Sequence, residues 1–93
     1  MRIRVAAENQ DRLRDFLRRA TPYYEQPGGI TVTLLQRSDD PEHFVEVVRY
    51  REERAYELDQ ARVRDDPVMK GHLAEWRTLL AEPPVIEVYR VGP

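Results

Sequence analysis

Two stretches rich in β-branched residues, with a turn-forming segment between them, constrain the fold of this chain more than any other feature. ITVTLLQR (30–37) and FVEVVRY (44–50) have the composition of β-strands. The intervening SDDPEH is dense in residues that favour turns. The pattern therefore predicts an antiparallel hairpin in the middle of the chain.

The segment before this hairpin indicates a strand followed by a helix. RIRVA (2–6) alternates charged and apolar residues, and the next sixteen or so residues place apolar side chains at helical spacing. These apolar residues are Leu13, Phe16, Leu17, Ala20 and Tyr24. The PGG at 27–29 should end the helix, because glycine adopts the left-handed conformation found at many helix ends.

The segment after the hairpin predicts two helices and a last strand. REERAYELDQARV (51–63) is typical of a helix, and Asp66 followed by Pro67 supplies a cap and a first residue for a second helix. Met69, Leu73, Trp76 and Leu80 form its apolar stripe. The helix should stop near the prolines at 83–84, and VIEVYRV (85–91) has the composition of a strand.

The resulting order, β-α-β-β-α-β with a split second helical region, predicts an α+β fold of the ferredoxin-like type. A single domain over residues 1–93 would hold a four-stranded antiparallel sheet with helices on one face. Alternation along the strands predicts which apolar residues face the helices. They are Ile3, Val5, Ile30, Val32, Leu34, Val45, Val47, Ile86 and Val88.

The opposite face of the predicted sheet mixes charged, aromatic and apolar residues. Its principal members are Arg4, Thr33, Phe44, Glu46, Val48, Tyr50, Glu87 and Tyr89. So large a half-apolar surface is unusual on a monomer, which predicts a homodimer with the two sheets face to face. Arg4 is expected to pair with Glu46 and Glu87 across this face.

Composition excludes several classes of function. The net charge is −2, and arginines such as Arg12, Arg14, Arg18 and Arg19 alternate with acids, so these residues predict a solvated helix face and no nucleic-acid partner. The absence of cysteine excludes disulfides and thiolate chemistry. No apolar run approaches the ~20 residues of a membrane span. We expect a cytoplasmic protein without a membrane partner.

Four segments taken together resemble one known family. They are the PGG after the first helix, DDPEHFVEV across the hairpin, DDPVM in the split helical region and the closing PPVIEVYRV. In order and pattern they are similar to the antibiotic biosynthesis monooxygenase-like proteins of the dimeric α/β barrel superfamily. The resemblance implies a dimeric α/β barrel with a ligand cavity between helices and sheet in each subunit.

Members of this family oxidise phenolic polyketides with O2 and without metal or flavin, degrade haem, or have no established activity. The resemblance thus implies cofactor-independent oxidation or binding of a small aromatic molecule. The two histidines, His43 and His72, lie on separate elements and form no ligand motif, so no metal site is expected. Tyr50 stands where many relatives carry tryptophan, and Val68 stands where many carry histidine. His72 and Tyr50 are the candidates for a catalytic group that deprotonates a phenol.

The candidate ligand pocket comes from the helical layer. Its predicted residues are Tyr24, Tyr56, Met69, His72 and Trp76. His72 lies three residues after Met69 and four before Trp76, so it borders the apolar stripe and is either a packed imidazole or a ligand-binding one. Two alternatives stay open: a non-catalytic homodimeric ligand-binding or assembly module, and a haem-binding protein that uses His72.

Overall fold

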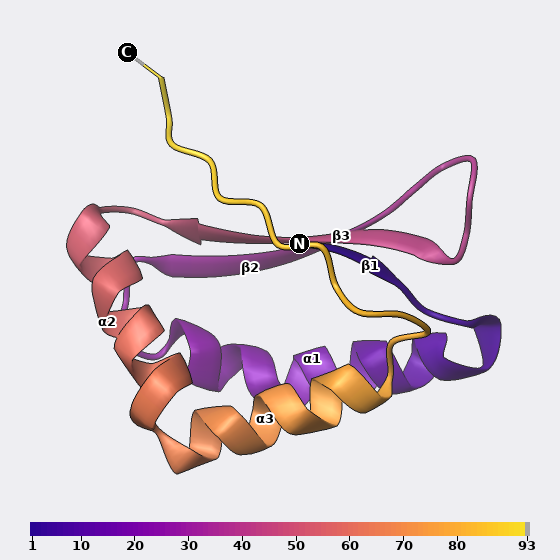
Figure 1. Cartoon of the computed structure of the whole chain (residues 1–93), viewed down its shortest axis with the longest axis horizontal. Coiled ribbons are helices and arrows are strands. Elements are labelled where there is room, and N and C mark those ends of the chain that lie inside the picture. Colours follow the sequence, from indigo (N-terminus) through magenta and orange to yellow (C-terminus); the bar gives the residue numbers. More distant parts are fainter. Residues whose placement is uncertain (93) are drawn as a thin grey trace.

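A three-stranded antiparallel sheet with helices on one face forms the framework of the molecule (Figure 1). The structure is a computed structural model that describes residues 1–92. Its elements are β1 (Arg2–Arg4), a 3-10 turn η1 (Ala7–Asn9), α1 (Gln10–Glu25), β2 (Ile30–Gln36), β3 (His43–Tyr50), α2 (Glu53–Asp65) and α3 (Pro67–Thr78). The α+β class and the element order up to residue 78 agree with the prediction.

The hairpin expected from the sequence is the centre of the sheet. The strand order is β1-β3-β2, and β3 pairs in antiparallel fashion with both neighbours. Leu34 lies opposite Glu46 in the β2–β3 register, and Ile3 lies opposite Phe44 in the β1–β3 register. Residues directly opposite one another share a face, so this register determines which side chains meet the helices.

The helix α1 covers the sheet with the apolar stripe that its sequence predicts. Its buried residues are Leu13, Phe16, Leu17 and Ala20. After α1, Gly28 and Gly29 have φ angles of 83° and 72°, a left-handed conformation that side-chain-bearing residues rarely adopt. The PGG segment thus reverses the chain into β2, as expected.

The helix α3 begins where the sequence predicts. The carboxylate of Asp66 accepts a hydrogen bond from the Val68 amide at 2.9 Å, and Pro67 occupies the first helical position. The side chain of Arg62, in the last turn of α2, donates to the carbonyls of Tyr23 and Tyr24 at the end of α1. This contact holds the α2–α3 corner against α1.

The phase of β3 differs from the prediction. Phe44 and Glu46 are 1% and 4% exposed, beneath the helices, whereas Val45 and Val47 lie on the other face. Phe44, Glu46, Val48 and Tyr50 therefore do not belong to the predicted dimer face, while Arg4 and Thr33 do lie on the helix-free face. Both phases of FVEVVRY are apolar, and the glutamate, normally an exposed residue, indicated the wrong one.

The fourth strand expected over residues 85–91 does not form. Val85 exchanges two backbone hydrogen bonds of 2.9 Å with Arg2, and the chain then leaves the sheet on the helix-free side (Figure 1). Residues 86–92, which we call the C-terminal tail, are exposed: Ile86 by 68%, Val88 by 64% and Tyr89 by 81%. The reason is that β1 has only three residues and offers a short edge for pairing.

The ion pairs of Arg4 also differ from the prediction. Its guanidinium lies 3.4–3.6 Å from Asp40, Glu42 and Glu82, because Glu46 points to the opposite face of the sheet. Glu87 pairs instead with Arg2 at 3.0 Å. The charges on this part of the surface therefore connect the hairpin loop and the chain after α3 to β1.

The free edge of β2 carries one side-chain contact. Glu25, the last residue of α1, accepts a hydrogen bond from the Val32 amide at 2.9 Å. A carboxylate thus occupies a backbone donor that would otherwise be available to another strand.

Candidate functional site

A buried carboxyl group lies in the layer between sheet and helices. Glu46 projects from the central strand β3, and burial raises the pKa of its carboxyl to about 7, although the Met1 amino group and Trp76 oppose this shift. A carboxyl group with a pKa near neutrality exchanges a proton easily under physiological conditions. The sequence pattern placed Glu46 on an exposed face, and its burial in the structure is what gives its carboxyl this pKa.

Two polar atoms in this layer have no hydrogen-bond partner among residues 1–92. They are Oε2 of Glu46 and Nε1 of Trp76, the indole of α3 that is 4% exposed. The indole N–H is near enough to Glu46 to lower the pKa of its carboxyl, but the two atoms are not hydrogen-bonded to each other. Buried polar atoms are almost always hydrogen-bonded, because an unpaired one costs about 1–3 kcal/mol. One atom accepts and the other donates, a combination that complements a hydroxyl group.

An aromatic cluster adjoins this pair. The ring of His72 lies 6.2 Å from Phe16, 5.4 Å from Tyr23 and 5.9 Å from Tyr24, measured between ring centroids. Burial, and then the negative charge of Glu46, raises the pKa of Tyr24, so this tyrosine keeps its proton. His72 is half-buried among these rings. A haem bound through His72 would have to displace them.

Tyr50, at the end of β3, belongs to a separate polar contact. Its hydroxyl donates to Oδ2 of the buried Asp59 on α2 at 2.5 Å, and its ring meets Tyr56 edge to face at 5.1 Å. Burial, followed by the hydrogen bond to Asp59, raises the pKa of Tyr50. Tyr50 is therefore a hydrogen-bond donor at neutral pH.

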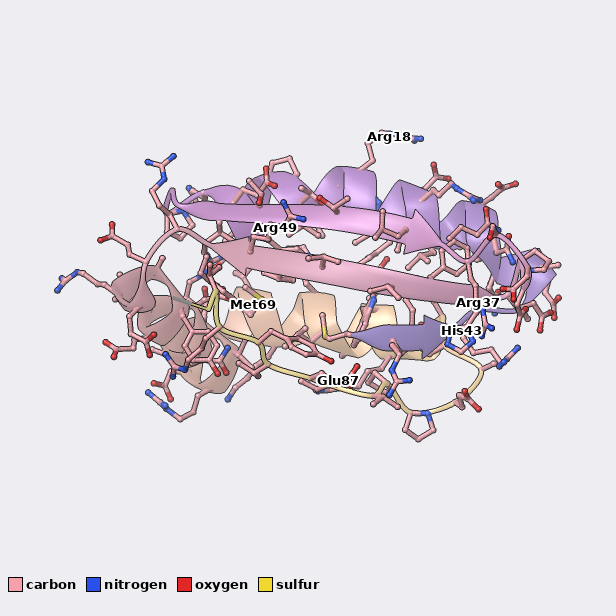
Figure 2. All side chains as sticks on the ribbon, turned by 90° about the horizontal axis from the view of Figure 1, so that it is seen from above. Arg18, Arg37, His43, Arg49, Met69 and Glu87 are labelled. Atoms are coloured by element: carbon pink, nitrogen blue, oxygen red, sulfur yellow. The ribbon has the colours of Figure 1, made fainter. Side chains whose placement is uncertain are left out.

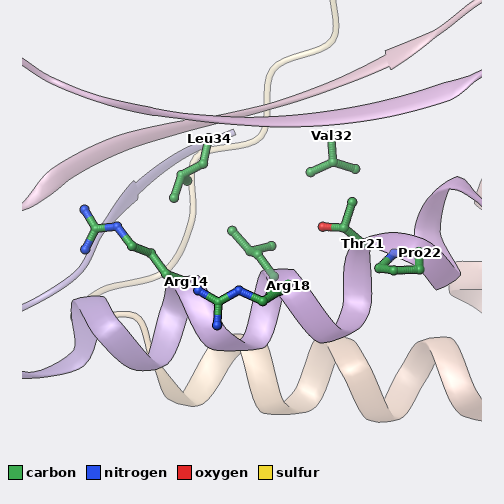
Figure 3. Close-up of a pocket in the computed structure, with 7 residues that line it drawn as sticks. Arg14, Arg18, Thr21, Pro22, Val32 and Leu34 are labelled. Atoms are coloured by element: carbon green, nitrogen blue, oxygen red, sulfur yellow. The ribbon is translucent and has the colours of Figure 1, made fainter.

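The five residues predicted to line a pocket are divided between these clusters. Tyr24 and His72 are neighbours, Tyr56 packs on Tyr50, and Met69 and Trp76 are buried on α3. None of them lines the larger of two surface hollows, which lies between α1 and β2 (Figure 3). Figure 2 shows the reason: α1 lies towards the β2 edge, and α3 lies towards β1.

Among residues 1–92, no group of three histidine, cysteine, aspartate or glutamate side chains is arranged to hold a metal ion. No helix in this part of the chain is long and apolar enough to span a membrane.

Solved structures with the same fold are known. A protein of Nitrosomonas europaea assigned as an antibiotic biosynthesis monooxygenase superimposes with a TM-score of 0.67 at 19% identity, over 88% of this chain and 76% of the other. A protein of Deinococcus radiodurans with the same assignment gives 0.66 at 14% identity, over 99% and 94%. At such identities the likeness establishes a shared fold.

Comparison of the sequence with known proteins and families identifies the family of the chain. No curated protein matches the chain. The antibiotic biosynthesis monooxygenase family matches residues 1–58, which include β1, α1, the hairpin and the strand that carries Glu46. The chain therefore belongs to the antibiotic biosynthesis monooxygenase family.

Proposed function

We propose that this domain binds a small phenolic molecule between α1, α3 and β3 and oxidises it with O2. The observation that carries the proposal is the unpartnered pair of buried polar atoms, Glu46 Oε2 and Trp76 Nε1. A phenol hydroxyl would donate to the carboxylate and accept from the indole, which satisfies both atoms. The neighbouring rings of Tyr24 and His72 would provide an apolar wall for the aromatic body.

Glu46 is the proposed base in this reaction. In the keto tautomer of the bound phenol, a ring CH2 is acidified by conjugation with the ring carbonyl. The carboxylate takes one C–H proton from this CH2, and the indole N–H stabilises the resulting enolate oxygen. The carbanion adds O2, forming a C–O bond. The remaining hydrogen of that carbon is lost as the O–O bond breaks, which leaves a carbonyl and hydroxide. Hydroxide takes the proton back from Glu46 and departs as water, so the net change is CH2 + O2 to C=O + H2O.

Glu46 replaces His72 and Tyr50 as the proposed base for physical reasons. Tyr50 holds its proton towards Asp59, and its pKa is raised. His72 packs against three aromatic rings, which suits a residue that positions the substrate. Glu46 is a buried group whose pKa lies near neutral pH.

The protein's single tryptophan allows binding and turnover to be measured separately. A panel of hydroxylated aromatics, among them phenols conjugated to a ring CH2, should change the fluorescence of Trp76, and a substrate should also consume oxygen. Glu46→Gln should lower oxygen uptake by about 10²-fold or more while binding is retained, because it removes the base and keeps the shape. Glu57→Gln, at an exposed position of α2, is the matched control.

The outcomes of this experiment separate the candidate functions. Fluorescence changes without oxygen uptake would favour a non-catalytic ligand-binding module. The oxidation proposal fails if Glu46→Gln consumes oxygen as fast as the wild type. A haemin titration that gives a shifted Soret band, lost in His72→Ala, would favour the haem alternative instead.

We also propose that the domain is a homodimer that associates through the helix-free face of the sheet. This face carries Thr33, Leu35 and Val47, and the exposed apolar residues of the C-terminal tail lie on the same side. A partner that covers them would remove apolar surface from water. Light scattering at micromolar concentration tests the proposal, and a monomer would refute it.

A further inference from the structure

A groove between α1 and the edge strand β2 is separate from the site around Glu46. We call it the α1–β2 groove; its volume is about 390 Å³ and it is open to solvent. It is lined by Arg14, Leu17, Arg18, Thr21, Pro22, Val32 and Leu34. Figure 3 shows Val32 and Leu34 pointing from the sheet towards α1.

The position of the helices explains why this groove exists. β2 is the outer strand of the sheet, and Val32 and Leu34 on its helix-facing side are only partly buried. The apolar stripe of α1 turns inwards to the core, while α3 lies on the far side, towards β1 (Figure 2). The apolar floor of the groove is therefore left without a covering helix.

Two arginines lie at the rim of the groove, each beside a carboxylate of α1, and the carboxylate of Glu25 accepts from the Val32 amide at the edge strand. Arg14 and Arg18 lie one helical turn apart, and none of the seven lining residues is acidic. Arg18 pairs with Asp15 at 2.7 Å, and Arg14 lies 4.0 Å from the fully exposed Asp11. Exposed pairs of this kind contribute little, so an incoming anion can compete for both guanidinium groups.

One arginine is held in place at this rim. The guanidinium carbon of Arg14 lies 5.8 Å from the centre of the buried Phe44 ring, a distance typical of cation–π contacts. Arginine binds carboxylates through two parallel hydrogen bonds, and less entropy is lost when the side chain is already positioned.

We propose that the α1–β2 groove binds a small carboxylic acid with an apolar body. The carboxylate lies between Arg14 and Arg18, and the hydrocarbon part packs on Leu17, Val32 and Leu34. The volume of the groove falls within the range of small-molecule sites. A charged rim over an apolar floor favours a ligand that has one anionic end and one apolar end. This site does not depend on the oxidation proposed above.

Octanoate and octanol are suitable probes, because they share a chain length and differ in charge. Calorimetric titration of the full chain should detect octanoate at millimolar concentration and a weaker interaction with octanol. Amide chemical-shift changes should map to Arg14, Leu17, Val32 and Leu34. The double variant R14Q/R18Q should bind octanoate about tenfold or more weakly, because two charge-assisted contacts are lost.

The matched control is Arg12→Gln, on the same helix and outside the groove. It should leave octanoate binding unchanged, and circular dichroism should show that both variants fold. Unaltered binding in R14Q/R18Q, or shift changes confined to residues around Glu46, would overturn the proposal. A third result would also overturn it: no octanoate binding, together with amide signals of the groove residues that broaden as protein concentration rises. This result would assign the groove to the C-terminal tail of a second copy.

Discussion

The layer around Glu46 and the C-terminal tail depart from the predicted exposure in opposite directions. In the first, a carboxyl group that sequence pattern assigns to the surface is 4% exposed. In the second, Ile86 and Val88, which pattern assigns to the core, are mostly exposed. Alternation along a strand thus shows which residues share a face, whereas the surrounding elements decide which face is covered.

Trp76→Ala should have the largest effect and would test how much the buried layer contributes. Removing this indole from the core should lower the free energy of unfolding by about 3–5 kcal/mol. Urea denaturation followed by circular dichroism measures the change. A loss below about 1 kcal/mol would mean that the layer is loosely packed.

Glu46→Gln should make the buried layer more stable at high pH. The pKa of Glu46 is about 7 in the folded protein and 4.5 as an unperturbed group, so its protonated form favours folding. The contribution of Glu46 to wild-type stability is therefore fully present below pH 4.5 and is lost as pH rises through 7, by about 3 kcal/mol in total.

The variant should lack this fall, so its advantage over the wild type should grow between pH 5 and pH 8. Denaturation midpoints at these two pH values provide the measurement. Parallel pH profiles for the two proteins would show that Glu46 is not desolvated.

Tyr50→Phe should weaken the end of β3. It removes the hydrogen bond to the buried Asp59 and leaves that carboxylate without the phenol donor. The expected loss is about 1–3 kcal/mol in the free energy of unfolding. Tyr89→Phe in the exposed tail is the control, and equal effects at the two positions would contradict the contact.

Asp66→Ala should destabilise the start of α3. It removes the cap on the Val68 amide and the hydrogen bond from the Tyr23 hydroxyl. A lost cap typically costs about 1 kcal/mol. Asp65→Ala, one residue earlier and exposed, should change the midpoint of thermal unfolding much less.

Val88→Ser should have the smallest effect on the stability of the isolated chain, within about 0.5 kcal/mol, because Val88 is exposed. If the tail is covered in a homodimer, the same change should raise the dimer dissociation constant. Sedimentation at several concentrations distinguishes these two results. An unchanged dissociation constant would place the tail outside the interface.

Local signals were sufficient for much of the fold. The hairpin, the buried stripe of α1, the PGG turn and the Asp66–Pro67 start of α3 were all predicted correctly, because each depends on neighbours within a few residues. The phase of β3 could not be predicted, since both of its faces are apolar and Glu46 is an atypical core residue. The predicted strand over residues 85–91 was wrong for another reason: its pairing depends on the length of β1.

The site residues named from the sequence stay a prediction. Tyr24, His72 and Trp76 lie in the helix–sheet layer, whereas Glu46, the buried carboxyl group with a pKa of about 7, had been placed on the dimer face. The α1–β2 groove was not predicted either, and Arg14 and Arg18 were interpreted as part of a solvated surface. A groove of this kind depends on the lateral offset between a helix and a strand, which no short sequence pattern encodes.

The contact between Glu25 and the Val32 amide has a consequence for assembly. A sheet with two open edges can add copies at both ends and grow into a filament, whereas a sheet with one obstructed edge can only close as a pair. The β1 edge is occupied as well, because Val85 exchanges backbone hydrogen bonds with Arg2 and the Ala81 amide donates to the Arg4 carbonyl. Glu25 thus completes a sheet in which both edges resist polymerisation by strand addition.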